Sequence, residues 1–287
     1  MREALLRDGL MMSVGNVYYV HGFDGSDTQD GETPSTPLKT ITAALAKCVN
    51  DHDDYIFVMD GWDQDGGVVS VNKHRVHIIG VGNALSSYVM QKATGDAYIF
   101  TVSGDYCEIA GFVLGGGSTA GGIQCNGSLG LWVHDCLFGG NDVGDTPKYG
   151  IVGVGGTVNA YMVLEKNLFT GSGGTSQGTI SDTGIYFPST NVCRSTVVRN
   201  NIFGQLPTRA IYLNDMYGGF VLDNRIACDE DADGAAIYMG GTSRGTLIDG
   251  NRANFGKTLM ARNPYVDLSS LNCWGVNYRG IAPILPA

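Results

Sequence analysis

The feature that most constrains this chain is an internal repeat. The segment AIYLNDMYGGFVLDNR at 210–225 matches the segment AIYMGGTSRGTLIDGN at 236–251 without a gap, sharing Ala, Ile, Tyr, Gly and Asp with it. The same pattern of a small residue followed by isoleucine recurs with isoleucines at positions 123, 151, 185, 211 and 237, in steps of 28, 34, 26 and 26 residues. A period of roughly 20–50 residues is typical of proteins built from stacked repeats.

A second apolar segment accompanies each isoleucine and fixes the fold class. Its inward residues are expected at Ile109, Val133, Leu164, Val198, Leu222 and Ile248. Gly, Asn, Asp and Ser separate these short segments, which leaves no room for a helix within a repeat. Successive repeats must therefore stack as parallel strands, and the sequence predicts an all-β, single-stranded parallel β-helix of about seven turns. We expect an N-terminal arm at 1–16, the β-helix at 17–255 and a C-terminal tail or cap at 256–287.

The composition agrees with many short strands, because 43 residues are glycine and only 16% are charged. The formal charge of −10 argues against a nucleic-acid partner or an anionic membrane, since both need a basic face. No apolar run reaches the roughly 18 residues of a membrane span, and the opening MREALLRDGLMMSVGN does not read as a signal peptide. The seven cysteines lack metal-binding spacing and are expected to be reduced thiols, which indicates folding in a cytoplasm.

The opening of the chain resembles a known family. The segment YYVHGFDGSDTQDGETPSTPLKTITAALAKC at 18–48, together with the repeat spacing, resembles the right-handed pectin-lyase-like β-helix superfamily. The resemblance implies a right-handed β-helix and a helix near 37–48 that covers its N-terminal end. Ser35 or Thr36 is the expected cap of this helix, and Pro37 suits its first turn. Its expected apolar face consists of Leu38, Ile41, Leu45 and Cys48.

Stacking places residues one repeat apart about 5 Å from each other, so outward residues form columns. The residues that follow the inward positions of the second segment give the column Ala110, His134, Glu165, Arg199, Asp223 and Asp249. One interpretation is a solvated ladder of charge pairs. The other is a glycoside-hydrolase acid pair of the retaining kind, formed by Asp223 and Asp249, with Glu165 and Arg199 as further catalytic candidates.

Two further columns have different expected roles. Asparagines are expected to stack inward and bond turn amides in the column Phe112, Cys136, Asn167, Asn201, Arg225 and Asn251. Tyr186, Tyr212 and Tyr238 follow the isoleucines of the first segment and are expected to face outward. These tyrosines form either an aromatic platform for a glycan or a partner protein, or a ladder covered by a loop or a neighbouring subunit.

An acidic turn is the candidate metal site. The run DEDADG at 229–234 places Asp229, Asp231 and Asp233 at the spacing that opens a calcium loop. The twelfth position is Gly240 rather than glutamate, which excludes an EF-hand. The alternatives are a lone Ca²⁺ site and an acidic surface turn, and the sequence requires no other cofactor.

Three functions stay open. We favour a structural protein on the surface of a bacteriophage virion (a tail spike, a tail-fibre component or a capsid decoration protein), made in the host cytoplasm without a signal peptide. For this function the resemblance implies a homotrimer, terminal segments that contact other virion proteins, and an outer face that contacts host-surface polysaccharide. The second function is a polysaccharide lyase or glycoside hydrolase. The third is a non-catalytic, glycan-binding adhesin.

Overall fold

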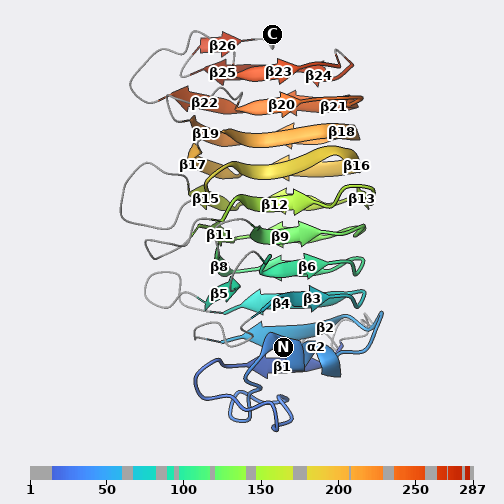
Figure 1. Cartoon of the computed structure of the whole chain (residues 1–287), viewed down its shortest axis with the longest axis vertical. Coiled ribbons are helices and arrows are strands. Elements are labelled where there is room, and N and C mark those ends of the chain that lie inside the picture. Colours follow the sequence, from blue (N-terminus) through green and yellow to red (C-terminus); the bar gives the residue numbers. More distant parts are fainter. Residues whose placement is uncertain are drawn as a thin grey trace, which may run out of the picture.

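The structure is a computed structural model. It describes residues 15–59, 67–81, 89–93, 97–116, 120–139, 147–170, 180–206, 208–228, 236–255, 264–269, 271–279 and 282–284. The strands form one elongated stack in which each turn lies on the previous one (Figure 1). Within the described residues, no helix is long and apolar enough to cross a membrane.

Two sheets run along the stack. The described part of the larger, 17-stranded sheet contains β1 (Val17–Val20), β2 (Asp54–Val58), β3 (Val69–Val71), β4 (Val76–Gly80), β6 (Phe100–Val102), β7 (Glu108–Ala110), β9 (Gly121–Cys125), β10 (Trp132–His134), β12 (Tyr149–Gly153), β13 (Val158–Ala160), β14 (Val163–Glu165), β16 (Thr183–Arg199), β18 (Arg209–Leu222), β20 (Ile237–Met239), β21 (Arg244–Asp249), β23 (Tyr265–Asp267) and β24 (Cys273–Trp274). The 9-stranded sheet contains β5 (Val89–Ala93), β8 (Phe112–Gly116), β11 (Leu137–Phe138), β15 (Leu168–Thr170), β17 (Ile202–Leu206), β19 (Arg225–Cys228), β22 (Arg252–Phe255), β25 (Asn277–Arg279) and β26 (Ala282–Ile284).

The predicted all-β, parallel β-helix is confirmed. Strands of successive turns pair in parallel, and only the terminal pair of β25 and β26 is antiparallel among the described pairings. The expected count of about seven turns differs slightly from the structure.

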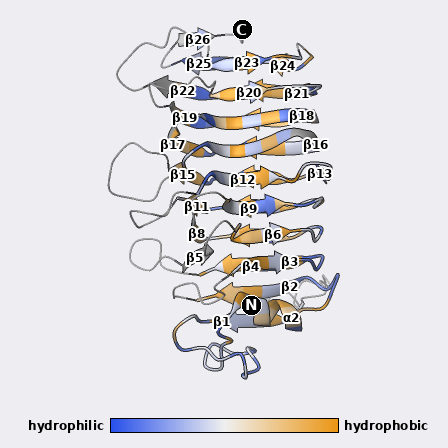
Figure 2. Ribbon diagram, viewed as in Figure 1, coloured by the Kyte–Doolittle hydropathy of each residue, from blue (hydrophilic) through white to orange (hydrophobic). Residues whose placement is uncertain are grey.

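The isoleucines of the repeat form the centre of the core. All five are fully buried and lie in register across strands β9, β12, β16, β18 and β20: Ile123, Ile151, Ile185, Ile211 and Ile237. Figure 2 shows hydrophobic residues recurring on the strands of successive layers. Burial of this continuous apolar column is the main stabilising contribution that each turn makes to the next.

The glycines before Ile123, Ile151 and Ile185 make room for an aromatic stack in the opposite sheet. Phe138, Phe169 and Phe203 stack with ring centroids 4.7 and 4.6 Å apart. A Cβ atom at Gly150 would lie 2.5 Å from the Phe169 ring, and one at Gly184 would lie 2.7 Å from the Phe203 ring. The glycines are therefore required by packing, because the phenylalanine rings touch the backbone of the facing strand.

A buried asparagine ladder closes one bend of every turn from β14 onward. The ladder consists of Asn167, Asn201, Asn224, Asn251 and Asn277. From Asn201 onward, each side-chain oxygen accepts the backbone N–H of the asparagine one turn earlier at 3.0–3.1 Å. The Asn167 oxygen accepts the backbone N–H of Cys136 at 3.1 Å. The sequence placed Arg225 in this column, and that placement is wrong, because Asn224 occupies it and Arg225 is exposed on β19.

The cause of this error is one extra residue in a turn. In the first arm Ile211 pairs with Ile237, an offset of 26 residues, as the ungapped alignment requires. In the second arm Val221 pairs with Ile248, an offset of 27. The added residue lies between Met239 and Arg244, so the inward residue of that layer is Val221 rather than the expected Leu222.

The N-terminal helix is present but shorter than expected. α2 spans Ile41–Lys47, and Thr40 caps it by accepting the backbone N–H of Ala43. Neither Ser35 nor Thr36 is the cap, because the chain around Leu38 is extended and bonds β1: Leu38 donates its N–H to Tyr19 and accepts the N–H of His21. Leu38, Ile41, Leu45 and Cys48 are buried as expected.

Parallel stacking continues past residue 255 into the segment expected to be a tail. β23 pairs with β20, β24 with β21, and β25 with β22. Tyr265 takes the place of the core isoleucine and is fully buried. Its hydroxyl donates to the carbonyl of Tyr278 at 2.8 Å, so this side chain ties the last described turn together.

Candidate functional site

A row of charged side chains crosses one outward face of the solenoid. We call it the charged strip, and it consists of His77, Glu108, His134, Glu165 and Arg199 on β4, β7, β10, β14 and β16. In one column, strand register places His77 beside Glu108 and Glu108 beside Trp132. In the adjoining column, His134, Glu165 and Arg199 are neighbours. These residues face outward because they alternate with buried residues such as Ile109 and Val133.

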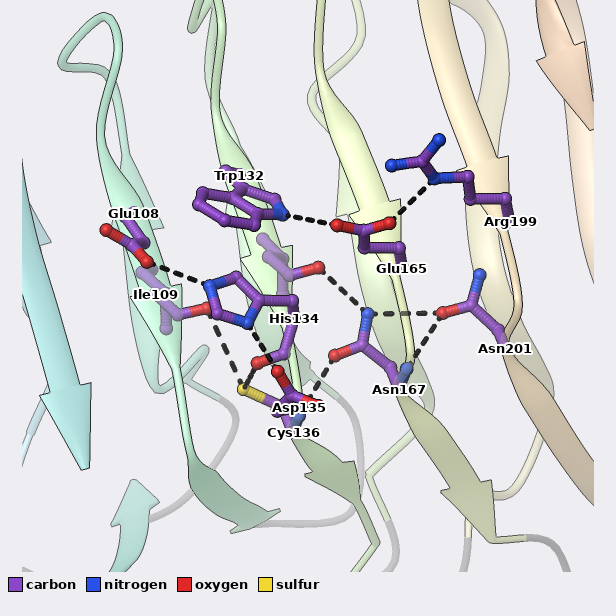
Figure 3. Close-up of polar contacts among 11 residues, drawn as sticks. Glu108, Ile109, Trp132, His134, Asp135, Cys136, Glu165, Asn167, Arg199 and Asn201 are labelled. Atoms are coloured by element: carbon purple, nitrogen blue, oxygen red, sulfur yellow. Dashed lines mark hydrogen bonds and ion pairs between the residues drawn. The ribbon is translucent and has the colours of Figure 1, made fainter. Parts of the chain in front are cut away.

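Glu108 is held between two imidazole rings. Its Oε2 lies 2.7 Å from His77 Nδ1. Its Oε1 lies 2.8 Å from His134 Nε2, a contact that Figure 3 shows. Burial alone would raise the pKa of this carboxyl, but the hydrogen bonds from His134 and His77 outweigh it and lower the pKa to about 2. Glu108 is therefore a carboxylate throughout the ordinary pH range.

His134 is enclosed by carboxylates. Its Nδ1 lies 2.6 Å from Asp135 Oδ2, and its Nε2 faces Glu108. Burial would lower the pKa of His134, yet the hydrogen bonds to Glu108 and Asp135 raise it above the usual histidine range. The sequence placed His134 in the outward column without assigning it a role.

Trp132 connects the two halves of the strip. Its indole ring lies over the His134 ring with centroids 4.0 Å apart, and its Nε1 donates to Glu165 Oε1 at 3.1 Å. Arg199 Nε donates to the other oxygen of Glu165 at 2.6 Å. Burial raises the pKa of Glu165, but the Arg199 guanidinium and the indole N–H reverse this and lower it.

The N-terminal end of the strip is also paired. The Tyr55 ring stacks on His77 with centroids 4.4 Å apart. Asp53 accepts two hydrogen bonds from the Arg75 guanidinium, at 2.9 and 2.5 Å, and its Oδ1 lies 3.6 Å from His77 Nε2. The hydrogen bonds from Arg75 lower the pKa of Asp53. The strip is thus a continuous network of opposite charges across neighbouring strands.

Three exposed aromatic side chains surround this network. We call them the aromatic platform: Tyr106 is 58% exposed, Trp132 39% and Tyr161 61%. Tyr106 and Tyr161 lie in the turns before β7 and β14 with positive φ angles of 56° and 58°. The left-handed conformation recurs at this bend in other layers, at Arg75, Gly130 and Ser195, so it belongs to the bend and does not by itself mark a functional site.

Gly130 occupies the same turn position in the layer between the two tyrosines. The Tyr106 ring lies over it, since a Cβ atom at Gly130 would be 2.5 Å from Tyr106 Cδ1. Backbone hydrogen bonds connect these turns from layer to layer, including Tyr106 N–H to Leu129 at 2.6 Å. Gly130 therefore allows Tyr106 to lean toward the layer of Trp132.

The predicted catalytic residues are only partly brought together. Glu165 and Arg199 form an ion pair, but the residue in register with Arg199 is Leu222 rather than Asp223. Asp223 lies one residue farther on, at the left-handed bend with φ 54°, outside the column that contains Asp249. The expected column that joined Asp223 and Asp249 is therefore wrong, because the extra turn residue shifts the second arm by one position.

The tyrosine column is confirmed and extends by one ring. We call it the tyrosine ladder: Tyr149, Tyr186, Tyr212 and Tyr238 follow each other with ring centroids 4.7, 5.1 and 4.9 Å apart. Tyr186, Tyr212 and Tyr238 are in register. Each ring covers the face of the next, so the ladder presents ring edges to solvent rather than the open faces on which a sugar stacks.

The candidate calcium ligands Asp229, Asp231 and Asp233 lie outside the described residues. Across the described ranges, no three histidine, cysteine or acidic side chains are arranged to hold a metal ion.

Sequence reasoning missed most of the site that the structure assembles. It considered the residue that follows the buried residue of each second segment, and so found His134, Glu165 and Arg199. It did not consider the residue that precedes each buried residue. Those residues are His77, Glu108 and Trp132, which stand in one register. Applying the strand alternation to both sides of the inward position would have located them.

No family model matches the chain, and no curated protein sequence matches it either. Among solved structures, GH136 lacto-N-biosidase from Eubacterium ramulus superposes with a TM-score of 0.61 at 13% identity, over 96% of this chain and 58% of that protein. This chain thus spans little more than half the length of that enzyme. Alginate lyase from Paenibacillus sp. str. FPU-7 superposes with a TM-score of 0.50 at 15% identity, over 83% of this chain and 92% of the lyase.

The Dettilon tailspike protein also matches, with a TM-score of 0.34 at 13% identity, over 97% of this chain and 74% of the tailspike. At these identities the likenesses concern the fold alone. The stacked parallel strands agree with the first two superpositions, and the chain has a parallel β-helix fold.

Proposed function

We propose that this protein binds polysaccharide through the aromatic platform of Tyr106, Trp132 and Tyr161. The observation that supports this proposal is the exposure of three aromatic side chains directly beside a buried ionic network. Aromatic faces bind sugar rings by apolar contact, and side chains that are fixed before binding lose little conformational entropy. Trp132 is fixed on two sides, by the His134 ring and by Glu165.

The pairing of the acids favours binding over cleavage at this face. Glycoside hydrolysis needs a carboxylic acid with a raised pKa that can donate a proton. In the charged strip the pKa values of Glu108 and Glu165 are lowered, and every carboxylate oxygen of both residues has a partner. Glu165 therefore serves to hold Trp132, the central side chain of the platform.

The binding proposal is tested by affinity electrophoresis and calorimetry with soluble polysaccharides, including alginate, polygalacturonate and dextran. We expect Trp132→Ala and Tyr161→Ala each to weaken binding about tenfold. Phe23→Ala is the matched control, because Phe23 is also exposed (62%) but precedes α2, away from the platform. Thermal melting verifies that each variant is folded.

Binding that survives both platform substitutions would refute the site. Wild-type protein that binds no member of a broad polysaccharide panel would refute the function. The same incubations are assayed for new reducing ends and for the ultraviolet absorbance of unsaturated products. We expect neither, and a positive result would replace binding by hydrolase or lyase activity.

The virion location and the homotrimer stay predictions that rest on resemblance. A platform for polysaccharide is compatible with a surface protein of a phage and equally with an adhesin. Light scattering of the purified chain tests the trimer, and a monodisperse species at the 30.4 kDa of a single chain would contradict it.

A further inference from the structure

The hydrogen bonds of His134 determine its charge state. Both ring nitrogens face a carboxylate oxygen, Nε2 at 2.8 Å from Glu108 and Nδ1 at 2.6 Å from Asp135. A carboxylate only accepts hydrogen bonds, so each nitrogen must carry a proton to bond its partner. Both contacts are satisfied together only when the ring is an imidazolium.

Trp132 lies against this cation. The indole and imidazole centroids are 4.0 Å apart with an interplanar angle of 31°. An aromatic face attracts a cation within about 6 Å of its centroid, and tryptophan does so most strongly. The second contact of Trp132, from Nε1 to Glu165, restrains the other edge of the indole.

We propose that His134 is a positioning residue whose imidazolium form holds the Trp132 ring in its binding orientation, so that loss of the proton weakens polysaccharide binding. The effect on binding rests on the function proposed above. The positioning itself does not, because it concerns the unliganded protein.

The charges around His134 favour the imidazolium. β7 contributes Glu108, the bend after β10 contributes Asp135, and β14 contributes Glu165 in register with His134. Three more distant groups act against them: His77 shares Glu108, Arg199 pairs with Glu165, and the Lys166 cation at the bend after β14 also lowers the pKa of Glu165. Carboxylates therefore dominate the immediate surroundings, which agrees with the raised pKa of His134.

The direction of the pH effect follows. The imidazolium is present at low pH and is lost as pH rises through the raised pKa of His134. After that loss, one nitrogen lone pair faces a carboxylate oxygen, and one of the two contacts must break. The indole then loses its cation but keeps Glu165, so we expect a partial effect, with binding weakened roughly fivefold.

Nuclear magnetic resonance measures this without any sugar. The indole N–H signal of Trp132, assigned with Trp132→Phe, and the ring signals of His134 are followed over a pH titration of the ¹⁵N-labelled chain. We expect the two sets of signals to move with one midpoint above the ordinary histidine value of about 6.5. In His134→Gln we expect the indole signal to lose this titration.

Two further variants sharpen the test. Asp135→Asn removes one of the carboxylates while keeping a residue that tolerates the positive φ of 52°, and we expect it to lower the His134 midpoint. His52→Gln is the matched control, because His52 also bonds a carboxylate, Asp54 at 2.7 Å, but lies outside the strip. It should leave the Trp132 signal unchanged.

An indole signal that does not follow His134, or an equal titration in His134→Gln, would overturn the proposal. Polysaccharide affinity is then measured at the two ends of the titration. A Trp132 signal that titrates with His134 in a protein that binds no sugar would retain the positioning role and refute the proposed function instead.

Discussion

The asparagine ladder gives the sharpest quantitative prediction, which concerns Asn224→Ala. The Asn224 side chain is fully buried, and its oxygen accepts from the backbone and side-chain N–H groups of Asn201, both at 3.0 Å. Its amide donates to the carbonyl of Val198 at 3.0 Å and to Asn251 Oδ1 at 2.9 Å. The substitution removes all four bonds and leaves two backbone groups buried without these partners.

The expected loss follows from the bonds. Stranding a buried polar group costs about 1–3 kcal/mol, so two backbone groups and two side-chain partners that partly rearrange give about 3–5 kcal/mol. Arg225→Ala is the internal control, because the ungapped alignment would place Arg225 in the ladder while the structure places it outside, exposed on β19. We expect this variant to stay within about 0.5 kcal/mol of the wild type.

Urea unfolding followed by circular dichroism compares the two variants, with equal slopes required before midpoints are converted to free energies. If Arg225→Ala destabilised the protein as much as Asn224→Ala, the register that places Asn224 in the ladder would be wrong. If neither variant shifted the midpoint, the ladder would contribute nothing, and the reasoning about stranded backbone groups would fail.

Three other predictions concern packing, pH and thiol reactivity. Gly150→Ala should destabilise the chain by about 1–3 kcal/mol in the same unfolding assay, because the new methyl group meets the Phe169 ring. Gly204→Ala is its control and should cost less than about 1 kcal/mol, since the nearest atom to a new Cβ lies 3.6 Å away. Since the pKa of Glu108 falls from 4.5 to about 2 on folding, its contribution to stability is complete above pH 4.5 and is lost as pH falls toward 2. Melting temperatures of Glu108→Gln should therefore depend less on acid than those of the wild type, and parallel curves would contradict the pairing. Burial raises the pKa of Cys48 and Cys136 to about 12, so site-resolved mass spectrometry should find both unmodified by a thiol reagent that labels the exposed Cys273 in the native protein.

The fold was predictable because the core of a solenoid repeats in the sequence. Ile185, Ile211 and Ile237 lie in one register, and each follows a small residue, of which Gly184 lies against the Phe203 ring of the facing sheet. Tyr186, Tyr212 and Tyr238 of the tyrosine ladder were predictable for the same reason, since each follows an isoleucine of that register, whereas Tyr149 comes two residues before Ile151 and was not predicted. The periodicity of the sequence thus predicts both the buried column and the residues next to it.

The site was less predictable because it does not repeat. His77, Glu108 and Trp132 occupy equivalent positions with different chemistries, so no pattern marks them until strand pairing is known. Asp223 shows the second difficulty. A single unaligned turn residue moved it out of register with Asp249, although its backbone N–H still donates to the Asp249 carbonyl at 3.1 Å.

The extra residue between Met239 and Arg244 has a consequence for how such chains diversify. The corner takes up the added length while the strands on either side keep their own pairing partners. Insertions and deletions at the corners therefore leave the strand pairing and the packing of the core unchanged. A lineage built on this architecture is free to vary its edges by insertion and deletion without first redesigning what lies beneath them.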